Sequence, residues 1–210
     1  MRHALFLSIA CGLVLLVSGC ARLGGGGPDW GDGARVVHRD DFERGAGRWS
    51  WSPDPEGAVH YDGDAGALDI EAPRGALVWF ESELVVPLRI EFEVEVLEPA
   101  GAGLRGLGIF VPAIDPSDPS RPPFRGRDPR EISGFNDLRT YFLGYGMAGN
   151  RVTRFARLGG GDRPADLFGQ KGQNLYLLQP GARYHFALVV DPPRVAVYRD
   201  RALIFEEADP

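Results

Sequence analysis

The chain has 210 residues, a formal net charge of −6 and no basic run, so nucleic acid is not an expected partner. Its 29 glycines and 17 prolines are spread along the sequence, which favours many short strands joined by turns over disorder. The glycine clusters lack the strand-to-helix context of a phosphate-binding loop, so we expect no nucleotide or other cofactor.

The N-terminus has the features of an export signal. Arg2 and His3 are followed by an apolar run, residues 4–17, that is too short to span a bilayer as a helix. The run ends in Val17-Ser18-Gly19-Cys20, which resembles the bacterial lipobox. The resemblance implies that residues 1–19 are a signal peptide and that Cys20 carries the lipid. An ordinary cleaved signal and a retained transmembrane helix are the alternatives.

The lipobox sets the expected organisation of the rest of the chain. Residues 20–33 are glycine-rich and predict a flexible tether, and residues 34–210 are enough for one domain with a sizeable core. Residue 21 is Ala rather than Asp, which implies the outer membrane if the host is Gram-negative. The only contact with a membrane would be the lipid anchor. Because the two cysteines are Cys11 and Cys20, the mature domain is expected to have no disulfide, thiolate metal site or cysteine nucleophile.

Alternation of apolar and polar residues dominates the mature chain. It is clearest in residues 88–97, where Glu91, Glu93 and Glu95 face away from the apolar side chains between them. Further strands are predicted at residues 66–71, 76–81, 107–111, 139–145, 151–158, 175–178, 183–190, 194–199 and 202–206. This spacing is typical of an all-β sandwich or jelly roll of two antiparallel sheets.

A long proline-rich stretch, residues 112–135, separates two of these strands. A connection of this length is usually functional or disordered. Asp115, Asp118 and Asp128 in it are oxygen ligands of the type that calcium takes, but loop aspartates more often begin turns, so no metal site is predicted.

Several segments of the mature chain resemble secreted bacterial domains of the concanavalin A-like lectin/glucanase superfamily. They include Asp40-Asp41-Phe42, Asn136-Asp137-Leu138-Arg139-Thr140-Tyr141, Thr153-Arg154-Phe155 and Asp209-Pro210. The resemblance implies a concanavalin A-like jelly roll and a polysaccharide substrate class, because such domains accompany pectin and rhamnogalacturonan degradation.

The sequence departs from that pattern in two places. Met147, Ala148 and Val152 loosen the hairpin motif, and relatives continue past the Asp-Pro pair with a further strand. We therefore expect the last strand to be missing, with an unpaired sheet edge, as in a truncated gene product.

The hairpin of residues 139–158 carries the candidate binding residues. Arginine pairs with a uronate carboxylate, and aromatic rings stack on sugar rings, so alternate positions of these strands suit an acidic saccharide. The predicted binding residues are Asn136, Asp137, Arg139, Tyr141, Tyr145, Asn150, Arg154 and Arg157. In the structural alternative, the arginines pair with acids on neighbouring strands and the tyrosines complete the core.

The sequence favours a protein that is anchored in the cell envelope and binds a saccharide. Three alternatives stay open. A polysaccharide lyase would use Arg139 with Tyr141, Tyr145 or His185 to move protons. A glycoside hydrolase would use the Glu91, Glu93 and Glu95 repeat, which resembles a laminarinase-type signature with an altered middle residue. A non-catalytic scaffold or degenerate fragment would have the arginine and tyrosine face covered or closed by ion pairs.

Overall fold

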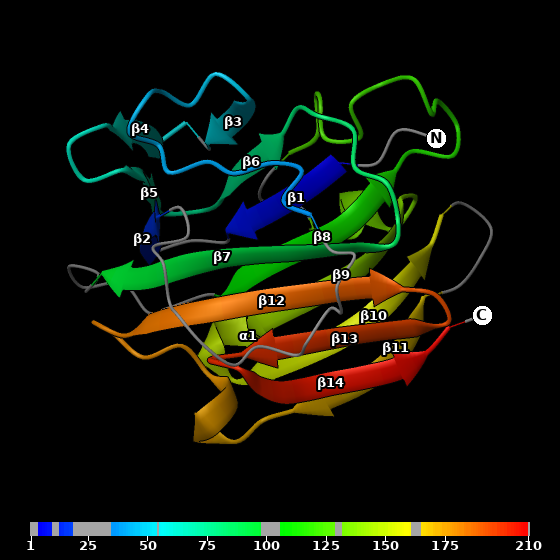
Figure 1. The fold of residues 1–210 in the computed structure, drawn as a ribbon. Coiled ribbons are helices and arrows are strands. Elements are labelled where there is room, and N and C mark those ends of the chain that lie inside the picture. The colour runs from blue at the N-terminus through cyan, green and yellow to red at the C-terminus, as the bar shows by residue number, and fades with distance from the viewer. Residues whose placement is uncertain are drawn as a thin grey trace.

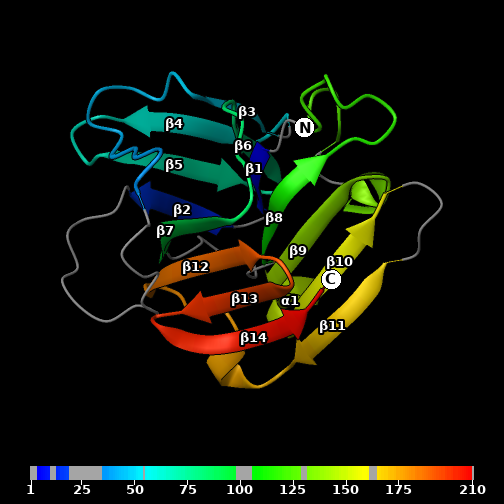
Figure 2. The ribbon, with the colours of Figure 1, turned by 45° about the vertical axis from the view of Figure 1, so that its right-hand side comes forward.

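The structure is a computed structural model. It describes residues 4–9, 13–18, 35–53, 55–97, 106–128, 132–160 and 165–209. Within this part of the chain, two antiparallel sheets pack face to face (Figures 1 and 2). The all-β sandwich that the sequence predicts is confirmed.

Each sheet has seven strands. The first sheet has the order β11-β10-β9-β8-β1-β6-β3, and the second has the order β14-β13-β12-β7-β2-β5-β4. The first sheet contains β1 (Ala4–Ile9), β3 (Trp49–Pro53), β6 (Ala76–Phe80), β8 (Leu107–Ile114), β9 (Arg139–Gly146), β10 (Val152–Gly159) and β11 (Asp166–Lys171). The second contains β2 (Leu13–Ser18), β4 (Ala58–Asp62), β5 (Ala67–Ala72), β7 (Leu88–Leu97), β12 (Arg183–Asp191), β13 (Arg194–Arg199) and β14 (Ala202–Ala208).

Five of the described strands, β1, β2, β3, β4 and β11, were not predicted, and one predicted strand is wrong. Strands β3, β4 and β11 are short and lie at or next to sheet edges, where alternation is weakest. Residues 175–178 are not a strand, because a 3₁₀ helix, Asn174–Tyr176, begins there. Two other short helices are described, Ile132–Phe135 and α1 (Met147–Asn150), and none of the described helices is long enough to cross a membrane.

The strand alternation places the main core between the two sheets. Phe155 of β10 and Phe186 of β12 are fully buried there, as are Val94 of β7 and Ile109 of β8. Charged residues of β7 alternate with these apolar ones and face outward, as the sequence predicts. One continuous apolar layer therefore holds the two sheets together.

The proline-rich stretch forms a second, smaller core on the outer face of the first sheet. Phe124 and Phe135 of this stretch pack against Phe110 and Phe142, whose ring centroids lie 4.7 Å apart. All four are at most 3% exposed. The described part of the stretch is therefore structural, and it gives the first sheet apolar cover on both faces.

Hydrogen bonds from Arg127 hold the proline-rich stretch in place. Its guanidinium donates to Asp137 at 2.8 and 3.0 Å and to Asp115 at 3.2 Å. The hydroxyl and backbone N–H of Ser117 also donate to Asp115, and these bonds lower the pKa of Asp115. Asp115 and Asp118 thus begin turns, and the described residues contain no group of three or more His, Cys, Asp or Glu arranged for a metal ion.

The N-terminal residues differ from their expected role in one respect. Residues 4–9 and 13–18, which the sequence predicts as part of a signal peptide, form β1 and β2 in this structure. Cys20 and the tether to residue 33 lie outside the described residues. Removal of residues 1–19 and lipidation of Cys20 stay predictions, as does the absence of a strand after β14, which is an edge strand here.

Substituting Phe124 tests whether the proline-rich stretch belongs to the fold. Phe124→Ala should lower the free energy of unfolding by about 3–5 kcal/mol, because it empties a fully buried site. Val85→Ala is the matched control, since that side chain is 68% exposed and should change stability by no more than about 0.5 kcal/mol. Urea unfolding measures both, and equal stabilities for the two variants would contradict the packing described.

Candidate functional site

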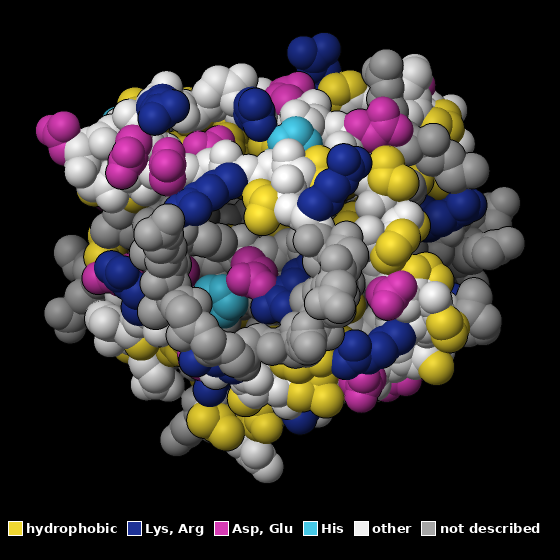
Figure 3. All heavy atoms as spheres, in the orientation of Figure 1, with side chains coloured by type: hydrophobic (Ala, Val, Ile, Leu, Met, Phe, Trp, Pro, Cys, Tyr) yellow, Lys and Arg dark blue, Asp and Glu magenta, His cyan; other side chains and the backbone are white. Residues whose placement is uncertain are grey.

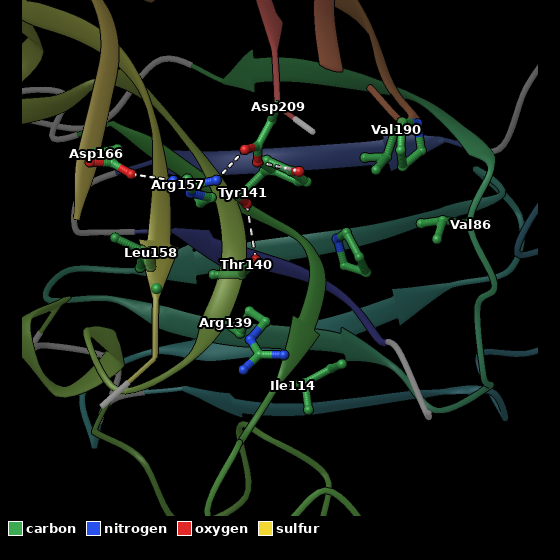
Figure 4. A pocket seen from close by; sticks show the side chains of 13 residues that line it. Val86, Ile114, Arg139, Thr140, Tyr141, Arg157, Leu158, Asp166, Val190 and Asp209 are labelled. Atoms are coloured by element: carbon green, nitrogen blue, oxygen red, sulfur yellow. Dashed lines mark hydrogen bonds and ion pairs between the residues drawn. The ribbon is translucent and has the colours of Figure 1, made fainter. Parts of the chain in front are cut away.

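A pocket of about 470 Å³ lies where the two sheets meet near the ends of β9, β10 and β12 (Figure 4). Its apolar wall comes from both sheets and from the segment before β7. The lining residues are Val86, Pro112, Ile114, Arg139, Thr140, Tyr141, Arg157, Leu158, Gly159, Asp166, Val190, Pro192 and Asp209. Three of these, Arg139, Tyr141 and Arg157, are predicted binding residues.

A polar network crosses one side of the pocket. The Tyr141 hydroxyl donates to Asp209 at 2.7 Å, and Arg157 donates to the other oxygen of the same carboxylate. A second nitrogen of Arg157 donates to Asp166. Arg157 is therefore held between two carboxylates, and Figure 4 shows this arrangement.

The strand register assembles the network. Tyr141 of β9 and Arg157 of β10 are register partners, and Asp166 of β11 is the partner of Arg157 on its other side. Side chains at paired positions lie on the same face of a sheet. Asp209 follows β14 of the opposite sheet, and its backbone N–H donates to the carbonyl of Pro193 at 2.6 Å. The Asp209 carboxylate is 8% exposed and joins the two sheets at this end.

Arg139 differs from Arg157 in having no acidic partner among the described residues. It begins β9, is exposed, and among the described residues its guanidinium makes no ion pair or hydrogen bond. Its side chain lies near Ile114 on the side of the pocket away from Asp166 (Figure 4). The pocket therefore combines a free cation, an apolar wall and a fixed set of carboxylate oxygens.

The environment of Tyr141 keeps its hydroxyl protonated. Burial raises the pKa of Tyr141 well above 10.0, and the hydrogen bond and negative charge of Asp209 raise it further. Arg157 opposes this rise only in part. Tyr141 is consequently a hydrogen-bond donor at neutral pH and a poor proton acceptor.

The other predicted residues on the inner face of the hairpin have structural roles. Tyr145 is fully buried and its hydroxyl accepts a 2.5 Å bond from Arg199. Asn150 donates to the carbonyl of Leu178 at 2.8 Å and accepts from its N–H at 2.9 Å. Tyr145 and Asn150 are therefore engaged within the protein, as in the structural alternative in which the tyrosines complete the core.

The remaining predicted residues lie elsewhere. Arg154 projects from the opposite face of β10 and its guanidinium lies 5.6 Å from the ring centroid of Phe142. Asp137 is paired with Arg127, and Asn136 is an exposed residue beside it. None of these three lines the pocket, so the structure gathers Arg139, Tyr141 and Arg157 and separates the rest.

A second group of charged residues occupies the outer face of the second sheet. His185 lies 3.3 Å from Glu91, and Arg183 donates to Glu95 at 2.6 Å and lies 3.8 Å from Glu93. Figure 3 shows acidic, basic and histidine side chains on the face of the molecule that this view presents. The glutamates that a hydrolase would use are thus engaged in ion pairs, and His185 is on the far side of its sheet from Tyr141.

Sequence reasoning missed Asp166, Asp209 and the apolar wall. Asp209 was noted only as part of an Asp-Pro pair, and Asp166 begins a strand that was not predicted. The pairing of Arg157 with acids on neighbouring strands was the structural alternative. No spacing in the sequence indicates that the residue after the last strand returns to β9 and β10.

Comparison with known families assigns the chain to one of them. The family described as Domain of unknown function (DUF6250) matches residues 70–210, which is most of the chain, and the protein belongs to that family. The match includes every strand that lines the pocket and begins after β1 to β4. Comparison with curated proteins and with solved structures gives no match.

The raised pKa of Tyr141 predicts a loss of stability in alkali. An unfolded tyrosine ionises near pH 10, whereas folded Tyr141 stays protonated, so the unfolded state loses its proton first and stability falls as the pH rises above about 10. Tyr141→Phe should make this fall less steep, by at most about 1.4 kcal/mol per pH unit and by less if solvent screens the half-buried group. Urea unfolding between about pH 9 and pH 11 measures the slope.

The exposed Tyr61 provides the control. It is 39% exposed, and Tyr61→Phe should leave the slope unchanged. If Tyr141→Phe and wild type lose stability in parallel above pH 10, the Tyr141 hydroxyl is not held as described.

Proposed function

We propose that the protein binds an acidic saccharide in this pocket, and that it does so at the cell envelope through a lipid on Cys20. The observation that carries the proposal is that the Arg139 guanidinium, at the edge of the pocket, has no partner within the described part of the chain, whereas the other cation, Arg157, is neutralised. A ligand with one carboxylate supplies the charge that Arg139 lacks. Arginine is suited to this role because its fork matches a carboxylate with two parallel hydrogen bonds.

The rest of the pocket supports a sugar as the bearer of that carboxylate. Carboxylate oxygens of Asp166 and Asp209 accept hydrogen bonds from hydroxyl groups. Val190, Pro192 and Pro112 provide apolar surface on which the C–H face of a sugar ring packs. A uronic acid unit has all three features, which agrees with the polysaccharide class implied by the resemblance.

Binding is favoured over cleavage by the state of the candidate proton carriers. A lyase needs a side chain that removes a proton, and the raised pKa of Tyr141 works against that role. Tyr145 is buried in the core and His185 faces away from the pocket. The scaffold alternative has one observation in its favour, since ion pairs to Arg157 close one side of the pocket.

Calorimetry with uronate oligosaccharides tests the proposal on the full 210-residue chain. Pectic oligogalacturonate should bind with measurable heat, and Arg139→Ala should weaken binding by about 10-fold or more, since a charge-assisted hydrogen bond contributes about 1.5–3 kcal/mol. Arg139→Lys keeps the charge and loses the two-pronged geometry, so its affinity should lie between the two. Arg154→Ala is the matched control outside the pocket and should bind as wild type does.

The same titrations separate the alternatives. Absorbance of unsaturated uronate that appears with wild type and disappears in Tyr141→Phe would establish a lyase and contradict a pure binding role. New reducing ends without that absorbance would indicate a hydrolase. Absence of heat with every acidic oligosaccharide, from a folded chain, would leave the scaffold.

A further inference from the structure

The charged groups that line the pocket are unevenly distributed. Arg139 lies at one end and has no partner among the described residues, whereas Arg157, Asp166 and Asp209 form the ion-paired network at the other end. Two carboxylates against one guanidinium leave that network with one net negative charge. The pocket is therefore positive at the Arg139 end and negative at the end of the network.

The two ends are far enough apart to face different units of a saccharide chain. Strand β10 separates β9, which carries Arg139, from β11, which carries Asp166. The register places these two residues two strands apart across the sheet and two residues apart along it, which is about 12 Å between their Cα atoms. The Arg139 side chain also lies on the side of the pocket away from Asp166 (Figure 4). A saccharide that pairs its carboxylate with Arg139 therefore has a neighbouring unit, rather than the same ring, beside Asp166.

Of the two carboxylates, Asp166 is the one that a ligand can reach. Both oxygens of Asp209 accept hydrogen bonds, one from Tyr141 and one from Arg157, and its side chain is 8% exposed. The Asp166 side chain is 50% exposed, and its Oδ2 accepts from Arg157. Its Oδ1 has no hydrogen-bond partner in the part of the chain that the structure describes. Asp166 therefore has an acceptor oxygen available to a ligand.

This oxygen distinguishes a hydroxyl group from a second carboxylate. A hydroxyl group donates a hydrogen bond to it, whereas an ionised carboxylate has no proton to donate and carries a charge of the same sign. The lining residues, all of which the structure describes, include no Lys or His, and their two arginines are Arg139 and Arg157. Since Arg139 would be occupied by the first uronate and Arg157 is already paired, a second carboxylate would meet no free cation.

We propose that Asp166 determines which acidic saccharide the pocket accepts. The preferred ligand is a chain whose uronate is followed by an uncharged unit with free hydroxyl groups, rather than a run of consecutive uronates. The uronate carboxylate pairs with Arg139, and a hydroxyl group of the neighbouring unit donates to Oδ1 of Asp166. Asp166 acts in this way only when a uronate occupies Arg139, so the inference rests on the proposed function.

Two trisaccharides of galacturonate that differ only in esterification test the inference on the full chain. One has three free carboxylates, and the other has a free carboxylate on its central unit and methyl esters on both outer units. Either direction of binding then places an uncharged unit beside Asp166. In calorimetry at low ionic strength, wild type should bind the diester about 5-fold more tightly than the triacid, because a second carboxylate approaches a net negative charge. This preference should shrink in about 1 M salt, where the screening length falls to about 3 Å.

Asp166→Asn removes the charge and keeps the size of the side chain and an acceptor oxygen. It should bind the triacid about 5-fold more tightly than wild type does and the diester as wild type does, so that the preference disappears. Retained binding of the diester also shows that the variant is folded. The matched control is Asp64→Asn, in the exposed turn between β4 and β5, which changes the net charge equally outside the pocket and should keep the wild-type preference.

The outcomes separate this inference from the proposed function. Equal affinities of wild type for the two trisaccharides, or tighter binding of the triacid, would overturn the inference and leave the proposed function standing. The same preference in Asp166→Asn as in wild type would also overturn it, since the discrimination would then not come from the Asp166 charge. If folded wild type binds neither trisaccharide, the proposed function fails and the inference fails with it.

Discussion

A strand in the middle of a sheet must have both of its backbone edges paired, and this constraint governs how the rest of the molecule is arranged. Strands β5, β6, β7 and β8 each carry fully buried apolar residues, so water does not satisfy the backbone groups along their edges. In the full-length chain β1 and β2 satisfy them. The two sheets then pack as continuous layers, and the position where β9, β10 and β12 approach one another at the pocket follows from that packing.

Two arginines have different roles in the pocket. Arg157 is held by Asp166 and Asp209 and fixes the ends of β10, β11 and β14 relative to one another. The charge of Arg157 is already balanced by these two carboxylates. Arg157 therefore contributes to the shape of the pocket and to the directions of its hydrogen bonds, and not a further attraction for an anion. Arg139 has no such partner, so a ligand carboxylate would meet an uncompensated charge there. The proposed binding of an acidic saccharide rests on this positioned network and on a cation that has no partner among the described residues.

The sequence predicts the parts of this structure that depend on local pattern. Alternation in residues 88–97 and 139–158 correctly assigns which side chains share a face, because that depends only on the pleat of a strand. Alternation does not tell which face of a strand the other sheet covers. Tyr145 and Arg139 were therefore predicted as members of one site, although Tyr145 is buried and Arg139 is exposed. Asp209 joined the site through a contact with Tyr141 that spans 68 residues of sequence, for which no local pattern exists.

Residues 4–9 and 13–18 belong to the predicted export signal, and in this structure they are strands of the two sheets. Recognition as a lipoprotein signal requires an apolar segment that can enter a membrane and be removed at Cys20. In this structure, Ala4–Ile9 lies between β6 and β8, and Leu13–Ser18 lies between β5 and β7. If the signal is removed, the sheets that the family match covers from residue 70 onward need another strand pair between β6 and β8 and between β5 and β7. The lipid anchor that we propose and the observed strand order therefore involve the same residues, because removal of residues 1–19 would remove the strand that pairs with β6 and β8 and the strand that pairs with β5 and β7.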